Sequence, residues 1–108
     1  MNSELRSWII KLGEAIRRLR LKKRIRAKDI SEGIGRPMVR YIEMENGQRG
    51  AYNYLPEIAR YLKVPLNYFD KYWPPRGRVQ NWLHMFVYRP EAKTYLTEHI
   101  KKLPLKKR

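Results

Sequence analysis

Apolar residues recur at helical spacing through most of the first 73 positions of the chain. In residues 5–23 they share one face of a helix: Trp8, Leu12, Ala15, Ile16 and Leu19. In residues 55–62 the spacing is the same: Leu55, Ile58, Ala59 and Leu62. Val64-Pro65 ends this second helix and starts another, on which Leu66 and Phe69 complete the core. The pattern predicts an all-α fold with a single modest core.

Residues 27–47, between these stretches, read as two short helices joined at Gly35. Apolar pairs at helical spacing mark each helix: Ile30 with Ile34, and Tyr41 with Met44. Gly35 gives the turn its backbone freedom, and Pro37 fits the first turn of the second helix. Gly47 is a residue typical of a left-handed helix end. This pattern fits a helix-turn-helix, and it equally fits an ordinary helical hairpin in a bundle.

The pattern changes at Pro74-Pro75-Arg76-Gly77, which breaks helical continuity and predicts a linker. Two further helical stretches follow: Val79, Trp82, Leu83 and Phe86 on the first, and Ala92, Tyr95, Leu96 and Ile100 on the second. The chain ends in a basic tail, Lys106-Lys107-Arg108. We therefore expect a domain over residues 1–73 and a helical extension over residues 74–108. Two helices cannot bury their own apolar faces, so the extension either packs on the domain or pairs with a second chain.

The formal net charge of +15, from 25 Lys and Arg against 10 Asp and Glu, adds a functional constraint. Cations crowd residues 17–28 with little balancing acid: Arg17, Arg18, Arg20, Lys22, Lys23, Arg24, Arg26 and Lys28. Such a surface repels itself unless it meets a polyanion. Trp8 and the isoleucines are needed for the core, which leaves no apolar face for lipid, so nucleic acid is favoured over a membrane surface.

Targeting, disulfide and membrane features are not evident. The chain has no cysteine, and the first residues carry no charged n-region. The longest apolar runs, such as Trp8-Ile9-Ile10, are too short to span a bilayer. We expect a soluble cytoplasmic protein, associated with the nucleoid.

Residues that could carry catalysis or bind a metal are poorly arranged. A predicted loop at Pro90 separates His84 from His99, and neither has an acidic partner nearby in the sequence. Glu43 and Glu45 are two apart on a helix and so point in different directions. Gly33 and Gly35 lack the third glycine and the Lys-Ser/Thr of a phosphate loop. We expect no enzyme, no cofactor and no metal.

Several short segments occur in a characteristic order and spacing: Leu12-Gly13-Glu14-Ala15-Ile16-Arg17, Asp29-Ile30-Ser31, Gly35, Tyr41, Met44, Glu45-Asn46-Gly47, and Tyr54-Leu55-Pro56-Glu57-Ile58-Ala59-Arg60-Tyr61-Leu62-Lys63-Val64. By these segments the chain from Leu12 to Phe69 resembles the helix-turn-helix domain of lambdoid phage repressors and Cro, the XRE-type family. The resemblance implies a compact five-helix domain, and the helical C-terminal extension that the spacing predicts lies outside the resemblance. It also implies a dimer whose third helix, residues 37–46, enters the major groove of DNA.

DNA binding requires phosphate neutralisation, anchoring and base reading. We expect phosphates to be neutralised by Arg26, Lys28, Arg49 and, in part, Arg40. Free N–H groups at Ala27 and Lys28, at the start of a helix, should face a further phosphate. The resemblance implies that the loop Asn46-Gly47-Gln48-Arg49 grips another.

The resemblance also gives the base-reading positions: Pro37, Met38, Val39 and Glu43, with Ala27 in support. Similar phage repressors often carry Gln where this chain has Ala27, Met38 and Val39. Met38 and Val39 cannot bond adenine, but they can contact a thymine methyl group, while Arg36 and Arg40 could contact guanine. The DNA is therefore read through thymine methyls, an arginine and DNA shape, or binding is weakly selective.

The resemblance implies an ion pair between Arg20 of the first helix and Glu45 of the Glu-x-Gly turn. For the dimer contact we expect the large apolar groups of the extension: Trp82, Leu83, Phe86, Tyr95, Leu96 and Ile100. The alternative is that these groups cover the back of the domain, near Phe69 and Trp73. If they form the dimer, truncation after Tyr72 should leave a folded monomer.

The sequence as a whole predicts a sequence-specific regulator of transcription that binds double-stranded DNA as a homodimer, and most simply a repressor. One alternative is the DNA-binding antitoxin of a toxin–antitoxin pair, whose extension covers a protein partner. Another is a helix-turn-helix module that contacts only protein. The density of cations favours DNA, because a protein-docking surface does not need it.

Overall fold

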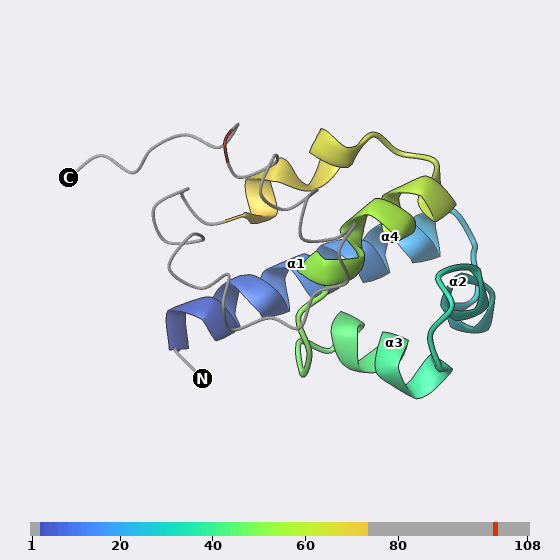
Figure 1. The fold of residues 1–108 in the computed structure, drawn as a ribbon, viewed down its shortest axis with the longest axis horizontal. Helices are drawn as coiled ribbons and strands as arrows, with labels where there is room; N and C mark the ends of the chain where they lie inside the picture. The colour runs from blue at the N-terminus through green and yellow to red at the C-terminus, as the bar shows by residue number, and fades with distance from the viewer. Residues whose placement is uncertain (1–2, 74–100, 102–108) are drawn as a thin grey trace.

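The computed structural model describes residues 3–73 and Lys101. In this part of the chain there are four α-helices, two 3₁₀ helices and no strand: α1 (Ser3–Lys22), α2 (Ala27–Gly33), α3 (Met38–Glu45), η1 (Tyr52–Tyr54), α4 (Leu55–Leu62) and η2 (Leu66–Tyr72) (Figure 1). The expected all-helical fold is thus confirmed for these residues. The extension and its six proposed dimer residues, Trp82, Leu83, Phe86, Tyr95, Leu96 and Ile100, lie outside the described residues.

The long helix α1 runs through the middle of the domain, and the shorter elements pack around it (Figure 1). Helix α3 contacts both α1 and α2, and α2 also contacts α4. The 3₁₀ helix η2 returns to α1 and α4. Helix α3 is therefore supported from two sides. Within the described residues, no helix is both long enough and apolar enough to cross a bilayer.

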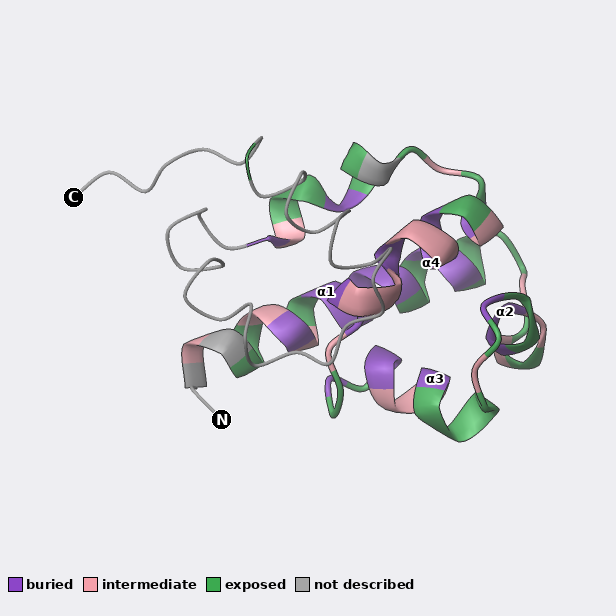
Figure 2. Cartoon of the chain, in the orientation of Figure 1, coloured by how far each residue is buried: buried purple, intermediate pink, exposed green. Residues whose placement is uncertain are grey.

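The core contains the apolar positions that the helical spacing predicted, together with four residues that it missed. The predicted residues that are buried are Leu12, Ala15, Ile16, Leu19, Ile30, Ile34, Tyr41, Met44, Leu55, Ile58, Ala59, Leu62 and Phe69 (Figure 2). Nothing is described of the Leu66 side chain. The missed residues are Ile9, Ala51, Tyr52 and Trp73. Trp8 packs against the core as predicted but is only partly buried, with the Lys11 ammonium group over its ring, whereas its neighbour Ile9 is fully buried.

Trp73 moves the end of the core beyond the truncation point considered above. The rings of Tyr52 and Trp73 lie 4.5 Å apart, and the Tyr52 hydroxyl donates to the Tyr72 carbonyl oxygen at 2.9 Å. Burial raises the pKa of Tyr52 above its ordinary value. A chain cut after Tyr72 would lose a buried aromatic side chain, so the cut must follow Trp73.

Both helices of the α2–turn–α3 unit end in the same hydrogen-bonded cap. After α2, the Arg36 N–H donates to the Ser31 carbonyl at 2.9 Å, and Gly35 adopts a left-handed conformation with φ +70°. After α3, the Gln48 N–H donates to the Glu43 carbonyl at 2.9 Å, and Gly47 has φ +77°. This is the Schellman motif, in which glycine accepts a backbone conformation that side chains disfavour.

Helix α3 lies unusually close to α1 because Gly13 has no side chain. A Cβ atom at Gly13 would contact the carbonyl oxygen of Met44 and would lie 2.7 Å from that of Glu45. Both are backbone atoms at the end of α3, so neither can turn away. Gly13 therefore fixes the depth at which α3 seats on α1.

Candidate nucleic-acid interface

The first turn of α3 points into solvent, whereas its last turn is half-buried at Ile42 and Glu43 and buried at Met44 and Glu45 (Figure 2). Met38 is 50 % exposed and Val39 is 63 % exposed, and Arg40 beside them is also exposed. Pro37, which caps the N-terminus of α3, is exposed as well. These four residues, Pro37, Met38, Val39 and Arg40, form the outer face of α3. Two large apolar side chains in water are a feature that the core does not explain.

Glu43 holds two arginines at the edge of this face. Its Oε1 atom accepts from Arg40 Nη1 at 3.1 Å and from Arg49 Nε at 3.0 Å. The Arg49 N–H also donates to the Glu43 carbonyl at 3.2 Å, which folds the following loop back onto α3. The bonds from Arg49 and then Arg40 hold the pKa of Glu43 below its ordinary value. We call Glu43, Arg40 and Arg49 the Glu43 cluster.

Arg26 is also paired with an acid. Its Nε and Nη2 atoms donate to the two carboxylate oxygens of Asp29 at 2.9 and 3.0 Å. The guanidinium group of Arg26 lowers the pKa of Asp29. Arg26 is the N-cap of α2, and no side-chain bond caps this helix end. Lys28 is exposed there, whereas Ala27 is partly buried against the core, which limits its reach toward a base.

Arg36, in the turn between α2 and α3, has a different partner. Its guanidinium carbon lies 4.9 Å from the centre of the Tyr54 ring. Its Nε atom is buried without a hydrogen-bond partner in the described part of the chain. The guanidinium group therefore lies over an aromatic ring and not against a carboxylate.

The loop after α3 supplies the remaining predicted contacts. Asn46 is the C-cap of α3, and Asn46, Gln48 and Arg49 are all exposed. Gly47 packs against Ile10 of α1, where a Cβ atom would lie 2.5 Å from Ile10 Cγ1. The loop is thus fixed on α1, with its polar side chains turned outward.

Arg20 and Glu45, the pair implied by the resemblance, are joined by two hydrogen bonds. Arg20 Nε lies 2.6 Å from Glu45 Oε2, and Nη2 lies 3.0 Å from Oε1. Arg20 Nη1 also donates to the Ile25 carbonyl at 2.9 Å. The side chains are only 10 % and 3 % exposed, so the pair is sealed between α1 and α3. The bond to Glu45 raises the pKa of Arg20, and burial raises the pKa of the neighbouring Tyr41.

The α2–turn–α3 unit and the loop after it carry all the predicted DNA-contact residues. The sequence reasoning missed Tyr54, Asp29 and the bonding role of Glu43. The Arg26–Asp29 and Arg40–Glu43 contacts join residues three apart on a helix, so the spacing could have indicated both. Nothing in the sequence pattern points from Arg36 to Tyr54, which lies 18 positions further on.

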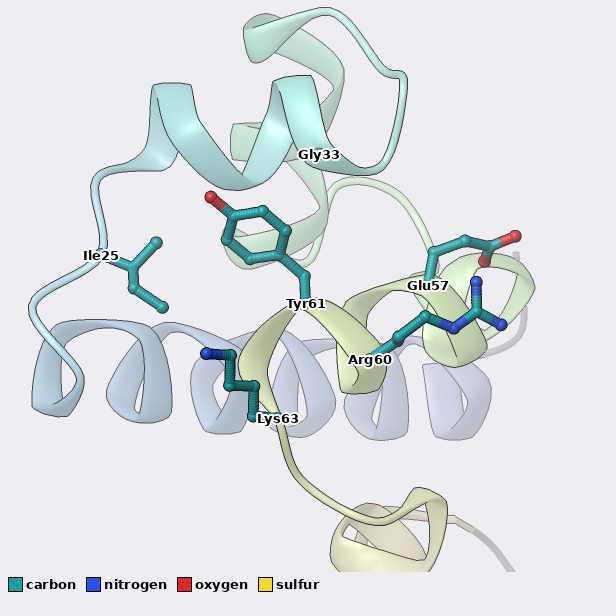
Figure 3. A pocket seen from close by; sticks show the side chains of 6 residues that line it. All are labelled: Ile25, Gly33, Glu57, Arg60, Tyr61 and Lys63. Atoms are coloured by element: carbon teal, nitrogen blue, oxygen red, sulfur yellow. The ribbon is translucent and has the colours of Figure 1, made fainter.

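A separate pocket of 580 Å³ opens between α2 and α4 (Figure 3). Six residues line it: Ile25, Gly33, Glu57, Arg60, Tyr61 and Lys63. A Cβ atom at Gly33 would strike the Tyr61 ring, so this glycine permits the close packing of α2 on α4. None of the predicted DNA-contact residues lines the pocket.

Comparison of the chain with protein-family models, with curated proteins and with solved structures found no significant match.

Proposed function

We propose that this protein binds double-stranded DNA as a sequence-specific regulator of transcription, a repressor that acts as a homodimer. The observation that carries the proposal is the outer face of α3. Met38 and Val39 stand in solvent there, and the guanidinium groups of Arg36, Arg40 and Arg49 belong to the same unit or to the loop that follows it. A helix that shows apolar groups and arginines has the means to read thymine methyls and guanine edges.

Two further features support the proposal. The net charge of +15 suits a phosphate backbone, and the resemblance to phage repressors covers the same α2–turn–α3 unit. In this proposal α3 lies in the major groove, and Lys28, Arg26 and the loop of Gln48 and Arg49 contact the flanking phosphates. Nucleoid association in the cytoplasm follows from the same proposal.

Protein-only binding is the alternative of a different class. It has the exposed Met38 and Val39 in its favour, because apolar groups in water also mark protein contacts. The surrounding cations weigh against it, since contact with protein does not require them. An antitoxin would bind DNA in the same way and would in addition cover a toxin with its extension.

Selection of bound sequences from random duplex DNA at two salt concentrations tests the proposal. We expect an enriched motif with the wild-type chain and a different motif with Val39→Ala. Lys28→Ala should weaken binding to all sequences alike and lower the salt slope by about one unit. Lys71→Ala in η2 removes the same charge from another element and should change neither the affinity for DNA nor the salt slope. Failure of the wild-type chain to retain DNA at low salt would contradict DNA binding.

The homodimer is proposed because one recognition helix reads only a few base pairs, and the family places two on half-sites about 34–36 Å apart. We propose that the apolar residues of the extension make the contact. Sedimentation equilibrium of the full-length chain and of a chain cut after Trp73 tests this. We expect the full-length chain to be a dimer and the chain cut after Trp73 to be a monomer. A full-length monomer would contradict the proposal, as would a dimer of the cut chain.

A further inference from the structure

The arginines of the interface fall into two groups according to their partners. Arg26, Arg40 and Arg49 each donate to a carboxylate, at 2.9–3.1 Å. Arg36 has no carboxylate partner within the described residues, and its guanidinium group stacks on the ring of Tyr54. In the first three a carboxylate already occupies at least one donor and offsets part of the charge, whereas a phosphate can approach Arg36 without competing with a carboxylate.

Both ends of the Arg36 side chain are fixed. The Arg36 backbone N–H closes the cap of α2 through its bond to Ser31. Tyr54 belongs to η1 and is the N-cap of α4, and its ring packs against the core. The stacked guanidinium group therefore has a restricted orientation before any ligand arrives. A pre-organised group loses less conformational entropy on binding than a free one.

The stacking also decides which way the guanidinium group can donate. Its Nε atom is buried, so the donors left for a ligand are those of the two terminal nitrogens. Arg36 lies in the turn before α3 and Tyr54 belongs to η1, so neither residue is part of the outer face of α3. A backbone phosphate suits this position better than a base edge, and a planar guanidinium can bind a phosphate through two parallel bonds.

We propose that Arg36 is a pre-formed phosphate anchor of this interface and that Tyr54 is the positioning residue that holds it. The proposal rests on the proposed DNA binding and changes the expected role of Arg36 from a guanine contact to a phosphate contact. Its consequence is that Tyr54, which itself touches no DNA, sets the strength of binding to every sequence.

A double-mutant cycle on the full-length chain tests the proposal. The measurement is fluorescence anisotropy with a short random-sequence duplex over a salt series. Arg36→Ala should weaken binding and lower the salt slope by about one unit. Tyr54→Leu should weaken binding about two- to fivefold, and Tyr54→Phe, which keeps the ring, should leave it near wild type. In the Arg36→Ala background, Tyr54→Leu should cause no further loss.

Two controls separate this role from a purely structural one. Tyr68→Leu makes the same change at an exposed tyrosine of η2 and should not alter binding. A thermal melt of each variant checks that binding is measured well below its melting temperature. If Tyr54→Leu does not fold, Tyr54→Phe and Arg36→Ala still decide, because an unchanged slope in Arg36→Ala overturns the anchor.

The outcomes distinguish the two proposals. Additive losses in the cycle, or a Tyr54→Phe chain as weak as Tyr54→Leu, overturn the positioning role while DNA binding stands. A wild-type chain that shows no salt-dependent binding to any duplex overturns the proposed function itself. A loss in Arg36→Ala that appears only on the selected sequence would return Arg36 to base reading.

Discussion

Glu43 and Glu45 lie two residues apart on α3, and each accepts hydrogen bonds from arginine, yet their surroundings are opposite. Glu45 is 3 % exposed and bonds Arg20 of α1, whereas Glu43 is 25 % exposed and bonds Arg40 and Arg49. Residues two apart on a helix point in different directions, so one carboxylate meets the core and the other meets solvent. A glutamate–arginine ion pair thus occurs once in the protein interior and once at the surface.

The surroundings of each ion pair determine how much it contributes to stability. In the interior, an ion pair that loses one member leaves a charge with neither water nor a partner, so the Arg20–Glu45 pair holds α3 against α1. At the surface, water and salt screen the attraction, and such a pair adds little to stability. The Glu43 cluster instead fixes where two cations sit on a face proposed to bind DNA. Burial thus separates the acid that holds α3 on α1 from the acid at the proposed interface, on a single short helix.

Removal of the buried acid should have the largest effect. Glu45→Gln keeps the shape but leaves Arg20 charged and buried, at a cost of roughly 3–5 kcal/mol in the free energy of unfolding. At about 4–8 °C per kcal/mol for a domain of this size, the melting temperature should fall by more than about 10 °C. Circular dichroism melts measure it.

Glu43→Gln, the identical change two residues earlier, is the matched control and should leave the melting temperature nearly unchanged. A double variant, Arg20→Met with Glu45→Leu, should recover most of the loss, because apolar residues of similar volume carry no charge to desolvate. Equal melting temperatures for Glu45→Gln and Glu43→Gln would show that burial does not separate the two pairs.

The helices and most of the core could be predicted because they depend on local periodicity. The spacing of Leu55, Ile58 and Leu62 requires only that one face of a helix be apolar. The burial of Trp73 could not be predicted, since it depends on Tyr52 meeting it across 21 positions of sequence. For a similar reason the sequence could not show that Ile9, and not Trp8, is the fully buried residue. Both positions lie near the apolar face of the helix, and only their packing partners in the fold determine which side chain is buried.

Glu43→Gln, the change at the half-buried acid, should also affect DNA binding. Glu43→Gln removes a negative charge from the proposed interface and releases Arg40 and Arg49. We expect tighter binding to every duplex and a steeper dependence on salt, because two more cations become available to phosphates. Fluorescence anisotropy over a salt series measures both quantities.

Glu14→Gln on α1 is the control for net charge, because Glu14 is exposed and lies on an element outside the α2–turn–α3 unit. Weaker binding in Glu43→Gln would instead mean that Glu43 must hold the arginines in place for DNA. Selection of bound sequences from random DNA detects a third possible outcome for Glu43→Gln. A changed base preference at unchanged overall affinity would support the base-reading role that the resemblance implies for Glu43.

The sequence allows residues to be proposed for the DNA interface, but it does not show how their side chains are held. Met38 and Val39 are assigned by the resemblance to phage repressors, which depends on segments in a fixed order and spacing along the chain. The partners of Arg49 and Arg36 come from segments that only the fold brings together, across six and 18 positions. Pairing between a loop and a helix leaves no periodic pattern in the chain.

The smallest effect, and the most direct probe of the Glu43 cluster, is a pKa. The pKa of Glu43 is lowered first by the bond from Arg49 and then by the bond from Arg40. We therefore expect Arg49→Ala to raise the pKa of Glu43 toward its ordinary value more than Arg40→Ala does. Carbon-detected NMR titration of the side-chain carboxyl group measures each shift, and added salt should reduce the difference.

The sign of the pH dependence follows from the direction of this shift. A carboxyl group whose pKa is lowered in the folded protein stabilises the fold above its unfolded pKa, about 4.3 for Glu, and loses that contribution as the pH falls through the folded value. The pKa of Asp29, which Arg26 lowers, serves as the internal reference and should be the same in both variants as in the wild type. If Arg40→Ala proves equal or larger, the loop that carries Arg49 is not held on α3 in solution. The Glu43 cluster would then be a contact within α3 alone, three residues apart, with no part in orienting the loop toward DNA.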